Sequence, residues 1–542
     1  MTAVLAQVRA EVVSRLRSPA TLVALLLVFA GSTLWIPDPR SNASSLSWTL
    51  PDGRVQAPLY DAAYIGFAST TLVAIFVPLV GFYLVAGSVR RDRECGVGAI
   101  LAATPLSKSA YLLGKGAAHT VYLLAVSGLA ALAGLLAFWR FGEGPFSAWR
   151  FLAPFVLLGL PTIVTTAALA VLFDVTPGLR GRAGLVLWFF VFMLVLIALP
   201  LGLAGGEKDG VPSRFPLIDP AGAATEAWLA RETLPEVKGI STGLLIADAP
   251  PERVPWPGIA ITPRVAVARA FNVLLAIPIL LAAIAIFDRF DPARARRAGR
   301  SRRAQAARPI AVPSGSLSGE SGRRSATAPA DAHPSTARAI LAEARLIWDT
   351  GSWFGWALLA ASTGGALLPS SAAPAFAAAF FLILVPAISE VAAREQMAGT
   401  SALVHSQPGV PSSPVLWKAA ASSLFALLLA APLLARTLLA GPARAAGLAA
   451  GLLFVSASAT ALAAMTSGGK LFSGSFLVLW YAAINRVPGA DFAGIFSDGA
   501  SLSTPGLYLL VGASLLATAL QIEKLQRHGL GAAWTRTSRR AA

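Results

Sequence analysis

The segment 87–115 gathers the residue types that could do chemistry. It reads GSVRRDRECGVGAILAATPLSKSAYLLGK and lies between two long apolar runs. Its glycines and lysines invite comparison with a phosphate-binding loop, Gly-x-x-x-x-Gly-Lys-Ser/Thr. The nearest matches, LLGKG at 112–116 and SGGKL at 467–471, lack the first glycine and a Ser or Thr after the lysine. We therefore expect no ATPase site in this chain.

Metal and nucleophile chemistry also find little support in the sequence. The single cysteine, Cys95, excludes an intramolecular disulfide and forms no recognisable zinc site. No His-Glu-x-x-His motif occurs, and no nucleophile and base recur at a credible spacing. The four histidines are too scattered for metal-ligand spacing: His119, His333, His405 and His528. We expect a protein that is not an enzyme and that holds no metal or cofactor of its own.

Recognition of a soluble partner suits the segment 87–115 better. A docking surface needs an apolar centre and a polar rim. Ile100, Leu101 and Leu106 could supply the centre, and Arg91, Arg93 and Glu94 the rim. Gly98 would permit a close approach of the backbone or a special backbone angle. Pro105 would end a short helix before the chain turns back into the apolar region.

The elements that position this segment are membrane spans. Of the 542 residues, 56% are hydrophobic and 13% charged, against about 25% charged in an ordinary soluble protein. A crossing helix needs about 20 mostly apolar residues, and lipid offers the backbone no hydrogen-bond partners, so the spans must be helical here. The chain reads as an all-α polytopic membrane protein with about twelve transmembrane helices. They cover about 20–37, 62–87, 112–138, 152–173, 182–204, 268–287, 353–369, 373–389, 416–438, 444–465, 471–485 and 505–521.

Lys and Arg set the expected orientation. They gather in the loops after spans two and four, which the positive-inside rule places in the cytoplasm: Arg90, Arg91, Arg93, Lys108, Arg180 and Arg182. The loop 205–264 then lies outside the cytoplasmic (inner) membrane, and both termini lie on its cytoplasmic side. The net charge of +17 fits contact with anionic lipid. No nucleic-acid-reading motif accompanies it, so we expect no nucleic acid partner.

Two segments outside the spans have distinctive patterns. Val4, Val8, Val12 and Leu16 recur every fourth residue, which predicts an amphipathic helix in the membrane interface, an uncleaved anchor rather than a signal peptide. Residues 294–324 hold nine Arg and a single Glu among Ser, Gly, Ala and Pro. That composition predicts a disordered tether.

The second half of the sequence restates the first. An amphipathic stretch with an Ala-Glu pair precedes each set of spans, at Glu11 and at Glu343. RECGVGAILAATP at 93–105 parallels REQMAGTSALVHSQP at 394–408, with Glu94 and Gly98 matched to Glu395 and Gly399. A Pro and a Lys follow in each copy: Pro105, Lys115, Pro408 and Lys418. We predict two parallel six-span units, 1–288 and 337–542, joined by the basic linker 289–336, with a central pathway between them.

This layout resembles the ABC-2 type permease family. The resemblance lies in the interfacial helix, the first two spans, and then Glu-x-x-x-Gly, Thr-Pro-Leu-Ser and Gly-Lys entering span three. It implies an exporter of an unidentified substrate whose ATP and Mg²⁺ are held by separate ATPase subunits, one under each half. It also implies that the segment after span two is a coupling helix. The residues carried over to that role are Arg93, Glu94, Gly98, Pro105, Lys115, Glu395, Gly399, Pro408 and Lys418.

Two alternatives stay open. A secondary transporter of the major facilitator type also has six plus six spans and a basic central loop, and GSVRRDRECG resembles its loop between spans two and three. The spacing is wrong for that loop, and no acidic relay suits proton-driven transport. A non-transporting membrane assembly factor is the other alternative.

Overall fold

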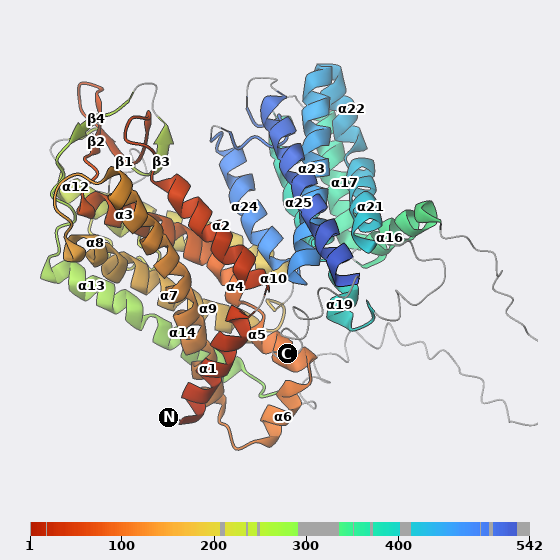
Figure 1. Cartoon of the computed structure of the whole chain (residues 1–542), viewed down its shortest axis with the longest axis horizontal. Helices are drawn as coiled ribbons and strands as arrows, with labels where there is room; N and C mark the ends of the chain where they lie inside the picture. The colour runs from red at the N-terminus through yellow and green to blue at the C-terminus, as the bar shows by residue number, and fades with distance from the viewer. Residues whose placement is uncertain are drawn as a thin grey trace, which may run out of the picture.

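The computed structural model describes residues 2–17, 19–180, 182–205, 212–234, 237–246, 250–290, 335–350, 352–368, 372–401, 413–487, 489–497 and 502–527. The described residues are mostly helical, at 74%. Figure 1 shows two groups of helices side by side, one built from the first part of the chain and one from the second. Most of the linker 289–336 lies outside the described residues.

The first group runs from the N-terminus to residue 290. Three short π-helical segments, η1, η2 and η3, interrupt its long helices. Its helices are α1 (Thr2–Leu16), α2 (Pro19–Trp35), α3 (Ala62–Phe76), η1 (Val77–Gly81), α4 (Phe82–Val85), α5 (Ser88–Glu94), α6 (Val97–Ala103), α7 (Lys108–Phe141), α8 (Ala148–Pro154), η2 (Phe155–Gly159), α9 (Leu160–Val175), α10 (Arg182–Phe190), η3 (Val191–Ala198), α11 (Leu199–Leu203), α12 (Ala223–Glu232), α13 (Pro263–Leu274) and α14 (Ala276–Ile286).

The second group begins after the linker and has no strands among its described residues. Its helices are α16 (Thr336–Thr350), α17 (Ser352–Leu367), α18 (Ala373–Ile388), α19 (Arg394–Ala398), α21 (Pro414–Leu429), α22 (Ala431–Ala440), α23 (Pro442–Thr466), α24 (Lys470–Ile484) and α25 (Ser503–Arg527).

A small sheet covers one end of the first group (Figure 1). The strands are β1 (Ala43–Thr49), β2 (Val55–Pro58), β3 (Gly239–Ile246) and β4 (Glu252–Val254), in the order β3-β1-β2-β4. β1 pairs antiparallel with β2 and β3, and β2 pairs parallel with β4. The sheet thus joins the loop after α2 to the loop 205–264, a partnership that the sequence analysis did not anticipate. We call this end of the molecule the sheet end.

Each of the twelve predicted spans lies on one helix or on consecutive helices. Six described helical stretches are long and apolar enough to cross a membrane: Ala62–Arg93, Lys108–Phe141, Ala148–Val175, Pro263–Ile286, Pro442–Thr466 and Ser503–Leu525. α21 and α22 make a seventh if the pair, bent by 65°, is one span. The other predicted spans lie on shorter described helices, such as α17 and α18 with 16 residues each. Sixteen residues cover roughly 24 Å, less than a bilayer core of about 30 Å. A count of twelve therefore stays a prediction.

The two groups share one hydrophobic core. Phe82 and Trp188 of the first group and Phe381 and Phe476 of the second belong to the same buried cluster. α24 packs against α4 and η1, and α10 approaches α18. We call this contact between the groups the seam.

α1 turns two charged residues toward the rest of the protein, and the location of its apolar stripe in the membrane interface stays a prediction. The predicted apolar stripe ends at Leu16, which is exposed, whereas Glu11 and Arg15 are buried. The reason is that α5 and α7 supply partners for these charges, and a buried charge is tolerated where it is paired. A pattern of apolar residues cannot show such pairing.

Candidate functional site

Five charged residues meet where α1, α5 and α7 converge. We call them the Glu11 cluster: Glu11, Arg15, Arg91, Asp92 and Lys115. Arg15 Nε and Lys115 Nζ bind the Glu11 carboxylate at 2.9 and 2.7 Å. Arg91 Nη2 adds a third contact at 3.0 Å. Lys115 also pairs with Asp92 at 2.8 Å, so three cations face two carboxylates and one formal positive charge remains.

Polar neighbours tie this cluster to the surrounding backbone. Arg15 Nη2 donates to the carbonyl of Val85, at the end of α4, at 2.9 Å. His119 Nε2 lies 3.4 Å from Arg15 Nη2 and 3.1 Å from Ser88 Oγ. The Tyr111 hydroxyl donates to Asp92 at 2.6 Å. One network therefore links α1, the α4–α5 junction and α7.

The electrostatics of Glu11 are dominated by its partners. Burial raises the pKa of this carboxyl, but the charges of Arg15, Lys115 and Arg91 outweigh burial and hold the pKa well below its usual range. Glu11 is therefore ionised at any physiological pH.

A second, smaller cluster of similar residue types lies in the second group. We call it the Glu343 cluster: Glu343, Arg394, Glu395 and Lys418. Arg394 Nη1 binds the buried Glu343 carboxylate at 3.1 Å, and Lys418 pairs with Glu395. Burial raises the pKa of Glu343, and the charges of Arg394 and Lys418 offset this only in part. The electrostatic environments of the two buried glutamates thus differ, since no counterpart of Arg15 binds Glu343 among the described residues.

One separation along the chain is the same in the two clusters. Lys418 follows its partner Glu395 by 23 residues, the separation that also holds between Asp92 and Lys115. An arginine immediately precedes the acidic residue in each case and binds the glutamate of the preceding amphipathic helix.

The predicted docking segment begins at a sharp break after α4. Gly87 has φ 83°, a left-handed conformation that glycine adopts without strain. The buried Asp174 of α9 accepts hydrogen bonds from the amides of Gly87 and Val89 and from Ser88 Oγ. This carboxylate fixes the first turn of α5, because it satisfies amides that have no partner within the helix.

α6 packs on the chain that follows α14. A Cβ at Gly98 would lie 2.7 Å from the Phe290 ring, so the close approach predicted for this glycine is present. Arg93 Nη2 binds Asp288 at 2.8 Å, and Arg289 Nη2 donates to the carbonyl of Thr104 at 2.8 Å. Burial raises the pKa of Asp288, but its hydrogen bond with Arg93 prevails and the pKa is lowered.

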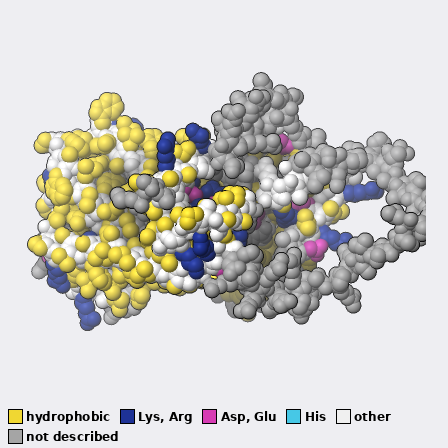
Figure 2. Space-filling view, turned by 90° about the horizontal axis from the view of Figure 1, so that it is seen from below, with side chains coloured by type: hydrophobic (Ala, Val, Ile, Leu, Met, Phe, Trp, Pro, Cys, Tyr) yellow, Lys and Arg dark blue, Asp and Glu magenta, His cyan; other side chains and the backbone are white. Residues whose placement is uncertain are grey.

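The remaining face of α6 is exposed and partly apolar. Ile100 is 68% exposed, Val97 is also exposed, and Pro105 is exposed in the turn that follows. Figure 2 shows the molecule from the side opposite the sheet, where Lys and Arg side chains gather next to hydrophobic ones. An apolar patch with a basic border is the pattern that a docking surface requires.

The predicted site residues fall into three sets. Arg93, Gly98 and Pro105 lie on or beside α6, and Gly399 ends α19 in the left-handed conformation. Lys115, Glu395 and Lys418 belong to the ion-pair clusters. Both lysines are buried. The Glu94 side chain and Pro408 lie outside the described residues.

Sequence reasoning assigned no role to four important residues. It missed the charges that complete the clusters and fix the α4–α5 turn: Arg15, Asp92, Asp174 and Arg394. The Arg-acid pair followed by Lys at one fixed distance was the available signal for two of them. Asp174 gave no such signal.

Two turns beyond the spans have the same internal hydrogen bonds. They read DPAGAAT at 219–225 and DFAGIFS at 491–497. Asp219 Oδ2 accepts from the amide and hydroxyl of Thr225 at 2.7 and 2.8 Å. Asp491 Oδ2 accepts from the amide and hydroxyl of Ser497 at 2.9 and 2.6 Å. Each turn thus closes a seven-residue stretch with one carboxylate.

The first of these turns adjoins a buried pair of opposite charges. Glu226 of α12 is buried near Asp219 and Arg269. Burial, aided by the Asp219 charge, raises the pKa of Glu226 to about 8, although Arg269 opposes this. Arg269 Nε donates to the carbonyl of Leu157 at 2.7 Å, so this side chain also holds the turn at 219–225 next to η2.

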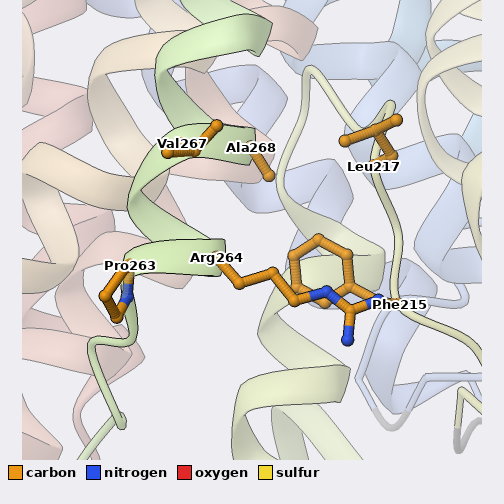
Figure 3. Close-up of a pocket in the computed structure, with 6 residues that line it drawn as sticks. All are labelled: Phe215, Leu217, Pro263, Arg264, Val267 and Ala268. Atoms are coloured by element: carbon orange, nitrogen blue, oxygen red, sulfur yellow. The ribbon is translucent and has the colours of Figure 1, made fainter.

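An open groove lies nearby on the surface. It has a volume of about 450 Å³ and is lined by Phe215, Leu217, Pro263, Arg264, Val267 and Ala268. Figure 3 shows Arg264 extended beside Phe215, with the guanidinium 4.2 Å from the ring centroid. One cation among apolar walls offers no general acid, base or nucleophile. The groove is not a catalytic site.

Comparison with known proteins relates the first half to transporters. Residues 21–218 match the family model described as ABC-2 family transporter protein. No curated protein and no solved structure matches the chain. The match and the long apolar helices point to a multi-pass membrane protein, and they support an ABC-2 type permease. ABC-2 permeases are membrane components without catalytic activity of their own and normally work with ATP-binding subunits.

Proposed function

We propose that this chain is the membrane-spanning subunit of an ABC-2 type exporter. It moves an unidentified substrate across the cytoplasmic membrane, with both termini inside, and a separate subunit hydrolyses ATP with Mg²⁺. The observation that carries the proposal is the exposed face of α6 within the matched region 21–218. In the proposed exporter, this face is the coupling surface that would meet the ATPase subunit.

The cluster behind α6 suits the transmission of force. α5 is held by Asp174 on one side and by the Glu11 cluster on the other, through Arg91 and Asp92. A motor that pushed on α6 would therefore move α5, α1 and α7 together. Arg93 and Gly98 attach α6 itself to the chain after α14.

Copurification tests this function. The tagged chain, extracted from its own membranes, should bring with it an ATPase that contains a Walker A loop. Ile100→Asp should reduce recovery of that ATPase at least tenfold, because a charge is placed at the centre of the apolar patch. Ile261→Asp, at an exposed apolar residue of the sheet end, is the matched control.

Other outcomes would favour the alternatives. Substrate movement that persisted without ATP and collapsed with the ion gradient would favour a major-facilitator-like transporter. A bound ATPase without ATP-dependent flux in vesicles would favour an assembly factor. Full ATPase recovery with Ile100→Asp would remove α6 from the docking site.

We propose further that the chain is a fusion of two related six-helix units. The Glu11 and Glu343 clusters support this, and they suggest a register that differs from the sequence alignment by two residues. The equal separations match Asp92, rather than Glu94, with Glu395. In that register Gly96, rather than Gly98, corresponds to Gly399, and both adopt positive φ, at 77° and 68°.

Two further likenesses support the duplication. Trp188 Nε1 donates to the carbonyl of Pro78 at 2.7 Å, and Trp480 Nε1 donates to that of Ala378 at 2.9 Å. In each case a predicted fifth span is joined to the second span of its own unit. The Asp-closed turns at 219–225 and 491–497 follow those fifth spans. The second unit would then offer α19 to a second ATPase subunit.

A further inference from the structure

We infer that Lys470 is a positioning residue that couples the docking segment of the first half to the second half. This inference rests on the proposed function, since it concerns how movement of α5 and α6 reaches the rest of the permease. The Lys470 ammonium crosses the seam and donates a hydrogen bond to the carbonyl of Ala86. Ala86 ends α4, and α5 begins two residues later.

The α4–α5 turn is held from both sides. From its own half, Asp174 accepts the amides of Gly87 and Val89. From the other half, Lys470 covers Gly87 so closely that a Cβ there would overlap the ammonium group. Arg90 and Arg180 line the same small cavity of about 20 Å³, which leaves room for about one water molecule. A displacement of α5 must therefore disturb α24.

The position of Lys470 in its own helix argues for a specific role. It is the first residue of α24, and the first turn contains no acidic residue. A cation at a helix N-terminus is disfavoured by the helix dipole. The Ala86 carbonyl across the seam accepts a hydrogen bond from this ammonium group and offsets that cost.

α24 is well suited to carry movement onward. A Cβ at Gly474 would lie 3.0 Å from the Tyr83 ring, so the helix backbone sits directly on α4. Farther along, Trp480 packs edge-on against Phe189 of α10, with centroids 5.6 Å apart. The helix is attached to the first half over several turns, and Lys470 is its contact nearest to the docking segment.

Spin-label distances in the purified permease–ATPase complex test the inference. In a Cys95→Ser background, labels at Leu341→Cys on α16 and Leu439→Cys on α22, both exposed and both outside α19, report movement within the second half. ATP with vanadate should shift this distance. Lys470→Met should remove at least half of the shift while ATPase recovery stays unchanged, and Lys470→Arg should restore it. Lys524→Met, on α25, should leave it intact.

Substitutions at two glycines test the coupling if the Lys470→Met variant does not fold. Gly87→Ala places a methyl group against the ammonium at φ 83°, whereas Gly96→Ala introduces similar backbone strain at φ 77° with nothing within 4 Å. Loss of the shift in Gly87→Ala alone supports the coupling. A full shift in Lys470→Met, or equal losses in the two glycine variants, overturns it.

Amide exchange of the chain without any ATPase separates this inference from the proposed function. Lys470→Met should speed exchange at least fivefold at both 87–91 and 471–474, because the two sides of the seam lose their common contact. Unchanged exchange overturns the contact itself. Absence of a copurifying ATPase would count against the exporter and leave this exchange result standing.

Discussion

Glu11 is a carboxylate shared by three cations inside the protein. Arg15, Arg91 and Lys115 all lie within 3.0 Å of its oxygens. Removing one partner of a buried ion pair leaves the others without compensation, which typically costs about 3–5 kcal/mol. Here three cations would lose their common anion.

Glu11→Gln should therefore lower the free energy of unfolding by about 3–5 kcal/mol. Thermal unfolding in detergent measures it, with the exposed Glu143→Gln as control. The lowered pKa of Glu11 means that its stabilisation is present above the ordinary value of 4.5 and is lost as pH falls below it. Equal melting temperatures for the two variants would contradict the prediction.

Glu226 should have the opposite pH dependence. Its pKa is raised to about 8, so between pH 4.5 and 8 the folded chain holds a proton that the unfolded chain has released. Its contribution is complete below pH 4.5 and is lost as pH rises to about 8, by about 1.4 kcal/mol per pH unit.

Melting curves from pH 5 to pH 9 test this slope. Glu226→Gln should flatten it, because the amide has no proton to lose. Glu232→Gln, an exposed residue at the end of the same helix, should leave the slope unchanged. A wild-type melting temperature that did not fall across this range would refute the assignment.

Sequence reasoning reached some of these residues and missed others for a physical reason. It selected Gly98 and Lys115 from their types and spacing, and the structure gives both close contacts. It ranked Glu94 above Asp92, because an acidic residue followed by Gly is visible as a motif. Which carboxylate pairs with a lysine 23 residues away depends on how the helices pack against one another, and the local sequence does not show this packing.

At the scale of elements, α6 depends on the chain that follows α14. Gly98 allows α6 to lie against Phe290, and Phe290 in turn packs edge-on against Phe287 at 5.1 Å. The proposed docking surface thus depends on residues almost 200 positions away in the sequence. Only a side chain no larger than hydrogen fits at this crossing.

Gly98→Leu should separate α6 from its support. We expect at least tenfold faster amide exchange over 97–103 and lower ATPase recovery, because a side chain would overlap the Phe290 ring. Gly128→Leu, at a glycine of α7 where an added Cβ has nothing within 4 Å, is the control and should change neither quantity. Normal exchange in Gly98→Leu would mean that α6 is held elsewhere.

Helix positions were predictable here, but their lengths and shapes were not. Each apolar run that was predicted as a span coincides with one helix or with consecutive helices. Burial in lipid and burial in protein favour the same residue types, so the runs mark helices in either case. The 65° bend between α21 and α22 and the π-helical segment at Pro78 arise from local breaks that hydropathy does not detect. The sheet was invisible because β1 and β3 lie almost 200 residues apart.

At the scale of the molecule, the two groups are unequal partners. The first has a sheet, and the second has no strand among its described residues. The family match is likewise confined to 21–218. The sequence predicted two halves, yet their contact through α24 depends on shape: Gly474 meets Tyr83, and Trp480 meets Phe189.

This contact should hold the halves together without a covalent link. Residues 1–290 and 335–542, produced as separate chains in one cell, should copurify because they complete a common core at the seam. Gly474→Leu should abolish copurification, since even a Cβ at this position lies 3.0 Å from Tyr83. Gly506→Leu, where nothing lies within 4 Å, should preserve it. If the two glycine variants behaved alike, the seam would be too weak to transmit motion between the halves, and the coupling would have to run through the linker or the ATPase subunits instead.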